Sequence, residues 1–300
     1  MIDLHMHSRY SSDGELTPSA LVEICAEQGI DMMSVTDHNC VRAAAEAVSA
    51  AAKRGIACIP GTEIDCTYHG VNFHMLGYGI DCASPDFEHI ENAVRAQGTA
   101  VSLQMLKKTQ ALGFHITEAE MRELARDSYW PEIWTGELFA EALLSRPDNK
   151  DHPLLMPYRA GGERGDNPPV NFYWDFYAQG KPCYAAIQYP AMQEIVDLIH
   201  QNQGIAVLAH PLVNVRGNRE LIGDIIGLGI DGIEAYSSYH SPVQAAGLAM
   251  EAKRRGLLIT CGSDFHGKTK PAVFPGKHGG SAAEDAIKAQ LETAIRKITN

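Results

Sequence analysis

The sequence lacks the cysteine patterns that mark disulfide frameworks and thiolate metal sites. Its seven cysteines are scattered and odd in number, and no two are spaced as Cys-x-x-Cys. It also lacks any stretch approaching the roughly 20 apolar residues that a membrane span needs. The chain opens directly into Met1-Ile2-Asp3-Leu4-His5, without a basic start or an apolar signal run. We therefore expect no disulfide framework and no membrane association, and we expect a cytoplasmic location.

Positive charge is also scarce in this sequence. Lys and Arg number 25 against 37 Asp and Glu, which gives a net charge of -12. A broad grip on duplex DNA requires a basic surface, so the composition argues against this class of partner. A small phosphorylated substrate remains compatible with the composition, because bound divalent cations would locally reverse the sign of the charge.

Two catalytic motifs are absent as well. Gly-x-Ser-x-Gly does not occur, so a Ser-His-Asp hydrolase is not indicated. Gly-x-x-x-x-Gly-Lys-[Ser/Thr] does not occur either, so a nucleotide-hydrolysing P-loop can be set aside. No pattern in the sequence indicates an oligomeric state.

What the sequence does contain is an alternation of short apolar runs with helical segments. The predicted strands are 2–5, 32–36, 57–59, 71–76, 205–209, 232–234 and 257–261. The predicted helices are 20–27, 41–54, 191–203, 243–255 and 282–298. Thr17-Pro18 is a typical helix start, with Pro at the first helical position. Repeated strand–helix units with short buried strands predict an α/β fold, either a parallel barrel or an open parallel sheet.

Residues 81–185 interrupt this alternation. Helices are predicted at 85–112 and 117–126, and residues 160–169 have the composition of a loop. All three tryptophans (Trp130, Trp134 and Trp174) lie in the segment. We therefore expect an inserted, mostly helical subdomain at 81–185, and a catalytic domain formed by residues 1–80 and 186–300.

His5 and His7 are two residues apart at the end of the first predicted strand. Side chains at positions i and i+2 of a strand share a face, so both imidazoles can reach one cation. Alone, the pair is as compatible with an exposed strand face that carries histidines by chance. Its value as evidence depends on the residues near the other strand ends.

Further His and carboxylate residues lie at or near the carboxyl ends of predicted strands, where parallel α/β folds place active sites. They are Asp13 in the loop after the first strand, Asp37 and His38 at the end of the second, Glu63 after the third, His74 within the fourth, His210 after 205–209, and Asp264 and His266 after 257–261. Burying so many such groups without partners would be costly, so a purely structural role for the whole set is improbable.

The number of these residues predicts more than one ion. One four-coordinate ion cannot use six histidines and three carboxylates, so two or three divalent ions are implied. Imidazole and carboxylate ligands without thiolate suit Mn, Zn or Fe. Asp37, beside His38, is predicted to orient an imidazole through its other nitrogen rather than to bind metal.

Together these motifs resemble those of the polymerase and histidinol phosphatase (PHP) family. They are His5-x-His7, Ser12-Asp13-Gly14, Thr36-Asp37-His38, Glu63, His74, Ala209-His210-Pro211 and Gly262-Ser263-Asp264-x-His266. The resemblance covers the chain outside the insertion and implies a distorted seven-stranded (β/α) barrel with a trinuclear metal site.

The resemblance also implies which residue holds which ion. It assigns His5, His7, Glu63 and Asp264 to the first metal, and makes Glu63 a bridge to a second metal bound by His74 and His210. It assigns Asp13, His38 and His266 to the third. His69 competes with His74 for its position, and His74 is preferred because it lies in an apolar strand.

The implied reaction is hydrolysis of a phosphate ester by a metal-bridging hydroxide. The insertion resembles that of a PHP branch acting on nucleoside 3′,5′-bisphosphates and on short 5′-phosphorylated RNA. The residues that carry this likeness are 176–184, Tyr236-Ser237-Ser238-Tyr239-His240-Ser241 and Phe265-His266-Gly267 with Lys270-Pro271. One element departs from it: the branch usually has Arg-x-His in a helix of the insertion, where this chain has Trp134-Thr135-Gly136-Glu137-Leu138-Phe139. Arg159 is a candidate substitute for the missing phosphate contact.

Arg9, His240 and Lys270 are further candidates for binding substrate phosphate, and the insertion's aromatic residues, Trp134 among them, for stacking on a nucleobase. The competing interpretation is that these aromatics form the core of the helical subdomain. Two alternatives to a nucleotide phosphoesterase stay open: a small-molecule phosphomonoesterase of the histidinol-phosphate type, and a non-catalytic PHP module.

Overall fold

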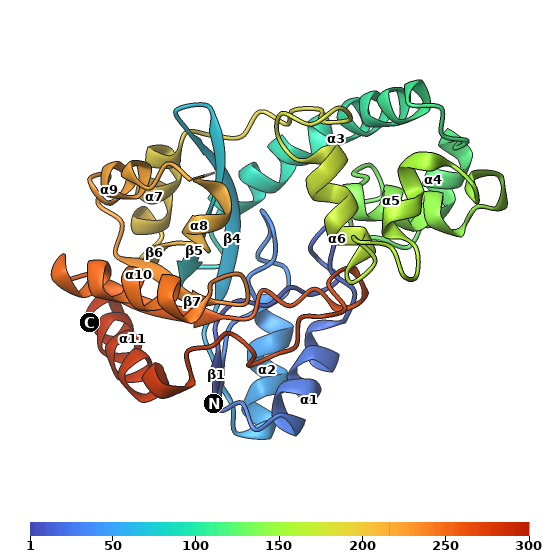
Figure 1. Cartoon of the computed structure of the whole chain (residues 1–300). Helices are drawn as coiled ribbons and strands as arrows, with labels where there is room; N and C mark the ends of the chain where they lie inside the picture. Colours follow the sequence, from blue (N-terminus) through green and yellow to red (C-terminus); the bar gives the residue numbers. More distant parts are fainter. Residues whose placement is uncertain (216, 300) are drawn as a thin grey trace.

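The computed structural model describes residues 1–215 and 217–299, with side chains to residue 297. Strands occupy the middle of the molecule and helices surround them, with one group of helices set apart on one side (Figure 1). The predicted mixed α/β class is thus confirmed. Within the described residues, no helix combines the length and apolar character that a bilayer span requires.

The amino-terminal strands form a small parallel sheet. It consists of β1 (Ile2–Asp3), β2 (Met32–Met33) and β3 (Ala57–Cys58), in that order. α1 (Pro18–Glu27) and α2 (Ala44–Arg54) connect these strands. The predicted start of α1 is confirmed, because Thr17 caps the helix by accepting a hydrogen bond from the Ala20 backbone N–H. α2 begins three residues later than predicted and ends at Gly55, which has a left-handed conformation.

A second sheet has five strands in sequence order. They are β4 (Gly61–Tyr68), β5 (Val71–Tyr78), β6 (Ile205–Leu208), β7 (Gly232–Ser237) and β8 (Leu258–Gly262). β6, β7 and β8 are parallel, whereas β5 is antiparallel to both β4 and β6. The expectation of a wholly parallel arrangement is therefore wrong at β5. The reason is local: His69 and Gly70, both with positive φ, form a tight turn that folds β5 directly back onto β4.

The two sheets contact one another at both ends. The Leu4 backbone N–H donates to the Cys261 carbonyl, and Met6 forms a parallel bridge with Phe265. At the other end, His38 forms a parallel bridge with Glu63. These contacts join the segments that follow β1 and β8 to each other and place the segment that follows β2 beside β4. Among the described residues, the hydrogen-bonded strand pairs form two separate sheets.

Amphipathic helices cover the five-stranded sheet and its edge. They are α7 (Met192–Gln201), α8 (Pro211–Asn214), α9 (Glu220–Ile226), α10 (Pro242–Arg254) and α11 (Glu284–Thr299), with single 3-10 turns at Gly267–Thr269 and Ser281–Ala283. In α7 the buried residues Met192, Ile195, Val196 and Ile199 recur at helical spacing and pack into the core that includes β5 and β6.

The segment between β5 and α7 is mostly helical. It contains α3 (Pro85–Ala111), α4 (Glu118–Ala125), α5 (Gly136–Ser145), α6 (Pro168–Phe172), a π-helical turn (Tyr173–Tyr177), and 3-10 segments at Pro147–Asn149 and Pro153–Tyr158. The two predicted helices correspond to α3 and α4, while α5 and α6 were not predicted. Buried residues between 105 and 183 form a core cluster of their own, and α4–α6 lie on the opposite side of the molecule from α7 and α9–α11 (Figure 1).

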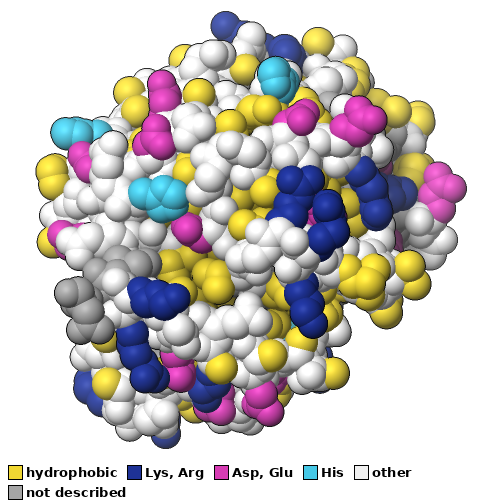
Figure 2. Space-filling view, turned by 90° about the vertical axis from the view of Figure 1, so that its left-hand side faces the viewer, with side chains coloured by type: hydrophobic (Ala, Val, Ile, Leu, Met, Phe, Trp, Pro, Cys, Tyr) yellow, Lys and Arg dark blue, Asp and Glu magenta, His cyan; other side chains and the backbone are white. Residues whose placement is uncertain are grey.

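Charged side chains of both signs are distributed over the face of the molecule shown in Figure 2. On the face shown in Figure 2, Lys and Arg side chains stand in small groups with acidic and hydrophobic side chains between them. This face therefore presents no continuous basic band of the kind that duplex nucleic acid binding uses.

Candidate metal centre

The nine predicted metal ligands converge on one buried site, although they are spread from residue 5 to residue 266. Most follow strands, as predicted. Glu63 differs, because it lies inside β4 and not after the third strand. His74 lies inside β5, where it pairs with Asp65 of β4 across the antiparallel ladder. His69, the rival to His74, is exposed at the turn of this hairpin and contacts the Tyr68 ring edge-on.

The first group consists of His5, His7, Glu63 and Asp264, whose nearest ligand atoms all lie within 4.8 Å of one another. His5 Nε2 lies 3.1 Å from Glu63 Oε2 and 3.2 Å from Asp264 Oδ1. His7 Nε2 lies 3.2 Å and 3.1 Å from the same two oxygens. Both imidazoles thus turn their Nε2 atoms toward the same pair of carboxylates.

Two further groups adjoin the first. Glu63 Oε1 lies 2.9 Å from His74 Nδ1 and 3.0 Å from His210 Nε2, so this carboxylate faces both groups. The last group contains Asp13, His38 and His266, together with His7. His266 Nε2 is 3.2 Å from Asp13 Oδ2. These three groups contain the three predicted ligand sets, with His7 as an additional member of the last. A fourth group, formed by His38, Asp65 and His74, was not predicted and shares its two histidines with the others.

Neighbouring residues fix which nitrogen each histidine presents. His5 Nδ1 lies 2.9 Å from Glu234 Oε1, so it carries the proton and leaves the Nε2 lone pair free. His266 Nδ1 donates to the backbone carbonyl of Asp264 at 2.8 Å, with the same consequence. Second contacts of this kind orient metal-binding histidines and raise their basicity.

The groups present fit divalent cations. Among the described residues, five buried atoms of the cluster have no hydrogen-bond partner: Asp13 Oδ1, His38 Nδ1, Glu63 Oε2, Asp264 Oδ1 and His266 Nε2. Leaving this many buried polar atoms unpaired is costly, and coordination to a cation would satisfy them together. His210 and Asp264 also hold positive φ values of 22° and 59°, a strained backbone that is typical of functional sites.

A glycine allows the strand that carries Asp264 to approach His5. A Cβ atom on Gly262 would lie 2.1 Å from the His5 Cβ. Any larger residue would force β8 and the segment after β1 apart, so Gly262 is required for the first ligand group to form.

The buried carboxylates of the site carry negative charge, which attracts cations. Burial raises the pKa of Glu63, but the positive charges of His5, His38 and His74 outweigh burial and hold it well below the usual value. Burial lowers the pKa of His7, but the adjacent carboxylates of Asp264 and Glu63 raise it to about 9. Glu63 is therefore ionised, and the additional proton that His7 binds in the metal-free protein occupies a position that a metal ion would take.

Asp37 acts less directly than predicted. Its carboxylate accepts hydrogen bonds from the Ser8 backbone N–H, the Ser8 hydroxyl and the Ser11 hydroxyl, and contacts no imidazole. Ser11 Oγ in turn lies 2.8 Å from His7 Nδ1. Asp37 thus orients His7 through Ser11, because the Ser11 hydroxyl bonds to both side chains.

Several residues of the site were not predicted. Glu234 is fully buried in β7 and binds both the His5 ring and the His210 backbone N–H. A carboxylate inside an apolar strand was the available signal. Asp65 shares a face of β4 with Glu63 and lies 3.0 Å from His74 Nε2. Its spacing of two residues from Glu63 was the same signal that identified His5 and His7.

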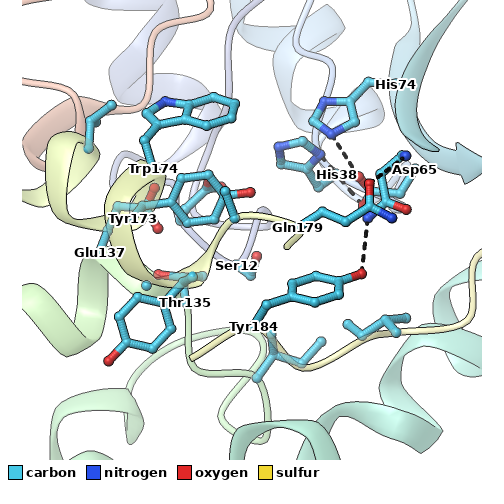
Figure 3. Close-up of a pocket in the computed structure, with 18 of the residues that line it drawn as sticks. Ser12, His38, Asp65, His74, Thr135, Glu137, Tyr173, Trp174, Gln179 and Tyr184 are labelled. Carbon is cyan, nitrogen blue, oxygen red and sulfur yellow. Dashed lines mark hydrogen bonds and ion pairs between the residues drawn. The ribbon is translucent and has the colours of Figure 1, made fainter. Parts of the chain in front are cut away.

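A cavity of about 240 Å³ opens on the cluster (Figure 3). Of the five predicted substrate contacts, Trp134 and Lys270 are among the described residues that line it, and Arg9, His240 and Arg159 are not. Lys270 Nζ lies 2.5 Å from Asp264 Oδ2. Arg159 instead donates to the carbonyls of Leu144 and Asn149. The His240 ring is bound to the Ala235 carbonyl, and Arg9 is exposed.

Comparison with known proteins identifies the family. The family described as PHP domain matches residues 3–143. The chain is 31% identical over 269 residues to a 3',5'-nucleoside bisphosphate phosphatase of Chromobacterium violaceum, covering 88% of this chain and 87% of that protein. The chain belongs to the PHP family.

Two further likenesses agree with PHP membership. A 5'-3' exoribonuclease of Haemophilus influenzae is 28% identical over 267 residues, or 88% of this chain and 89% of that protein. The solved structure of an amidohydrolase from Chromobacterium violaceum matches with a TM-score of 0.74 at 28% identity and covers 96% of each chain. The resemblance read from the motifs is confirmed, and so is the predicted class, a metal-dependent phosphoester hydrolase that uses divalent cations.

Proposed function

We propose that this PHP-family enzyme hydrolyses a phosphate ester of a nucleotide at a cluster of three divalent cations. The observation that carries the proposal is the set of four overlapping ligand groups, three of which contain the predicted ligands. Of these three, two share Glu63 and two share His7. Glu63 is the proposed bridge between the first two ions. The imidazole and carboxylate donors suit Mn, Zn or Fe.

When bound, divalent cations lower the pKa of water and stabilise negative charge on a transferring phosphoryl group. The protein's own residues orient the ligands for this chemistry. Tyr239 donates to Asp264 Oδ2 at 2.6 Å, and Lys270 pairs with the same oxygen. Both contacts direct the other oxygen, Oδ1, toward His5 and His7. Glu234 and Ser11 hold the Nδ1 atoms of these two histidines, so that Nε2 is the nitrogen each would offer to a metal ion.

The nucleotide part of the proposal rests on two supports. The relatives at 31% and 28% identity are named as a nucleoside bisphosphate phosphatase and an exoribonuclease. In addition, Tyr173, Trp174 and Tyr184 line the cavity beside the cluster. Base–aromatic stacking contributes about 1–3 kcal/mol per base, which is enough to select a nucleoside.

We further propose that the strands form a closed, distorted seven-stranded barrel, in which β3 and β4 act as one strand. The contacts of Leu4 with Cys261 and of His38 with Glu63 support this closure. The proposed domain division is a catalytic barrel of residues 1–80 and 186–300 with an inserted subdomain at 81–185. The separate core cluster between residues 105 and 183 supports it.

The test combines metal analysis with phosphate release. We expect Glu63→Gln and Asp264→Asn to lose bound metal and to lower hydrolysis of nucleoside 5′-monophosphates by at least about a hundredfold. Glu27→Gln, a matched change at an exposed site, should change neither quantity. Activity near that of the wild type in both ligand variants would refute the assignment. Full metal occupancy without hydrolysis of any phosphate ester would indicate a non-catalytic module.

A further inference from the structure

The cavity beside the metal ligands has a second wall that belongs to the helical segment. Figure 3 shows His38, Asp65 and His74 on one side and Glu137, Tyr173 and Trp174 on the other. The second wall is formed by the start of α5 and by the π-helical turn Tyr173–Tyr177. A bound phosphate ester would place its phosphate at the metal ligands, so this wall faces the rest of the substrate.

The wall is close-packed, which fixes the position of Glu137. A Cβ atom on Gly136 would lie 2.9 Å from the Tyr173 ring and 2.9 Å from the Tyr177 Cβ. Thr135 caps α5 by accepting a hydrogen bond from the Leu138 backbone N–H. The first turn of α5 is therefore held against the π-helical turn, and Glu137, only 8% exposed, lines the cavity from there.

Cationic side chains are scarce around the cavity. Among the described lining residues, Lys270 is the one Lys or Arg, and it is paired with Asp264. Asp13, Asp65 and Asp264 lie among the histidines of the cluster. Glu137 stands apart from them as an acidic group on the second wall. Burial raises the pKa of its carboxyl to about 7, and the negative charge of Asp13 adds to the rise.

We propose that Glu137 accepts hydrogen bonds from free sugar hydroxyls of a nucleoside monophosphate, and that this wall rejects a second phosphate. The inference deepens the proposed nucleotide hydrolysis and rests on it. A carboxylate is a suitable partner for ribose hydroxyls, as in dinucleotide-binding folds. The same carboxylate repels a phosphate in that position, and no guanidinium among the described lining residues compensates.

The tryptophans of the inserted helical segment differ in whether they are buried in a core or line the cavity. Trp130 and Trp134 are 1% and 3% exposed and belong to core clusters. Trp174 is half-buried and lines the cavity, so its ring is available to a base. Trp130 therefore fits the competing interpretation as a core residue, Trp134 belongs to a core cluster and also lines the cavity, and Trp174 lines the cavity.

The experiment compares kcat/KM of the metal-loaded enzyme for three substrates: adenosine 5′-monophosphate, its 2′,3′-dideoxy analogue and adenosine 3′,5′-bisphosphate. We expect kcat/KM for the monophosphate to be at least about tenfold higher than kcat/KM for each of the others, because a site built to bind hydroxyls rejects analogues that lack them. For the dideoxy analogue, the decrease in kcat/KM should come mainly from a higher KM.

Substitutions at Glu137 then test the residue itself. Glu137→Arg should reverse the preference between monophosphate and bisphosphate, and the isosteric Glu137→Gln should reduce it without unfolding α5. The matched control is Glu141→Gln, one turn later in α5, where the side chain is exposed and pairs with Lys268. This control should keep the wild-type preference.

The outcomes separate the two proposals. If nucleotides are hydrolysed but the wild type prefers the bisphosphate, or if neither Glu137 variant alters the ratio, the role of Glu137 is wrong while the proposed function stands. If the metal-loaded enzyme hydrolyses none of the three substrates, the proposed nucleotide function fails and the inference fails with it.

Discussion

The Ser11 hydroxyl shows how single residues set up the cluster. It accepts a hydrogen bond from the His38 backbone N–H and donates its own proton to Asp37. The contact with His7 Nδ1 must then be one in which the imidazole donates. One hydroxyl group therefore fixes the proton of His7 at Nδ1 and turns the Nε2 atom toward the metal site.

Glu234 has the same role for His5 and in addition binds the His210 backbone, so its loss should affect two ligands. We predict that Glu234→Gln lowers metal affinity by about 10–100-fold, as is typical for residues that orient metal ligands. The measurement is metal content at controlled free Mn or Zn, with Glu27→Gln as the exposed control. Unchanged affinity in Glu234→Gln would mean that the His5 ring is held by other contacts.

At the scale of elements, the β4–β5 hairpin and the start of α5 place the residues that the sequence left ambiguous. The hairpin brings His74 of β5 opposite Asp65 of β4, beside Glu63. The packing of α5 on the π-helical turn places Glu137 in the cavity. Neither α5 nor α6 was predicted. α5 begins with Gly136, a weak helix former, and α6 has only five residues and begins within the stretch 160–169, which has the composition of a loop.

Gly136 offers a test of the contact between these elements. We predict that Gly136→Ala destabilises the protein by about 1–3 kcal/mol, because its Cβ would collide with Tyr173 and Tyr177. The same change at Gly247 in α10 should instead stabilise by about 0.5–1 kcal/mol, since no described atom lies within 4 Å of its added Cβ. Urea unfolding measures both. Equal effects of the two substitutions would contradict the close packing of α5.

At the scale of the whole molecule, the cluster ties distant parts of the chain together. His5 and Glu234 are 229 residues apart, and His210 and Glu63 are 147 apart. A cation bound here would connect segments that follow β1, β2, β6 and β8 with the β4–β5 hairpin. Metal binding is therefore expected to stabilise the fold as a whole and not one loop.

We predict that chelation lowers Tm, and that the difference between metal-loaded and metal-free protein widens as the pH rises. In the metal-free protein the pKa of His7 is raised to about 9. Its contribution to stability is thus fully present below the unfolded pKa of about 6.5 and is lost as the pH rises through 9. Metal affinity instead increases as the pH rises, because fewer protons compete for the ligands.

Scanning calorimetry at pH 6.5 and pH 9, with and without chelator, measures this difference. At a free metal concentration of about 100 Kd, each site should contribute about 2.7 kcal/mol. A Tm that does not respond to chelation at either pH would show that the cluster folds without metal ions and does not bind them tightly.

The sequence by itself determined the chemistry of the site and the family. Nine His, Asp and Glu residues near strand ends sufficed, because the type of side chain and its place on a strand are local properties of the chain. Only the tertiary structure decided how these residues are supported and what faces them. The contacts of Ser11 and Glu234 and the position of Glu137 in the cavity all depend on segments far apart in the chain. Such contacts leave no local pattern, and so they could be known only after the chain was folded.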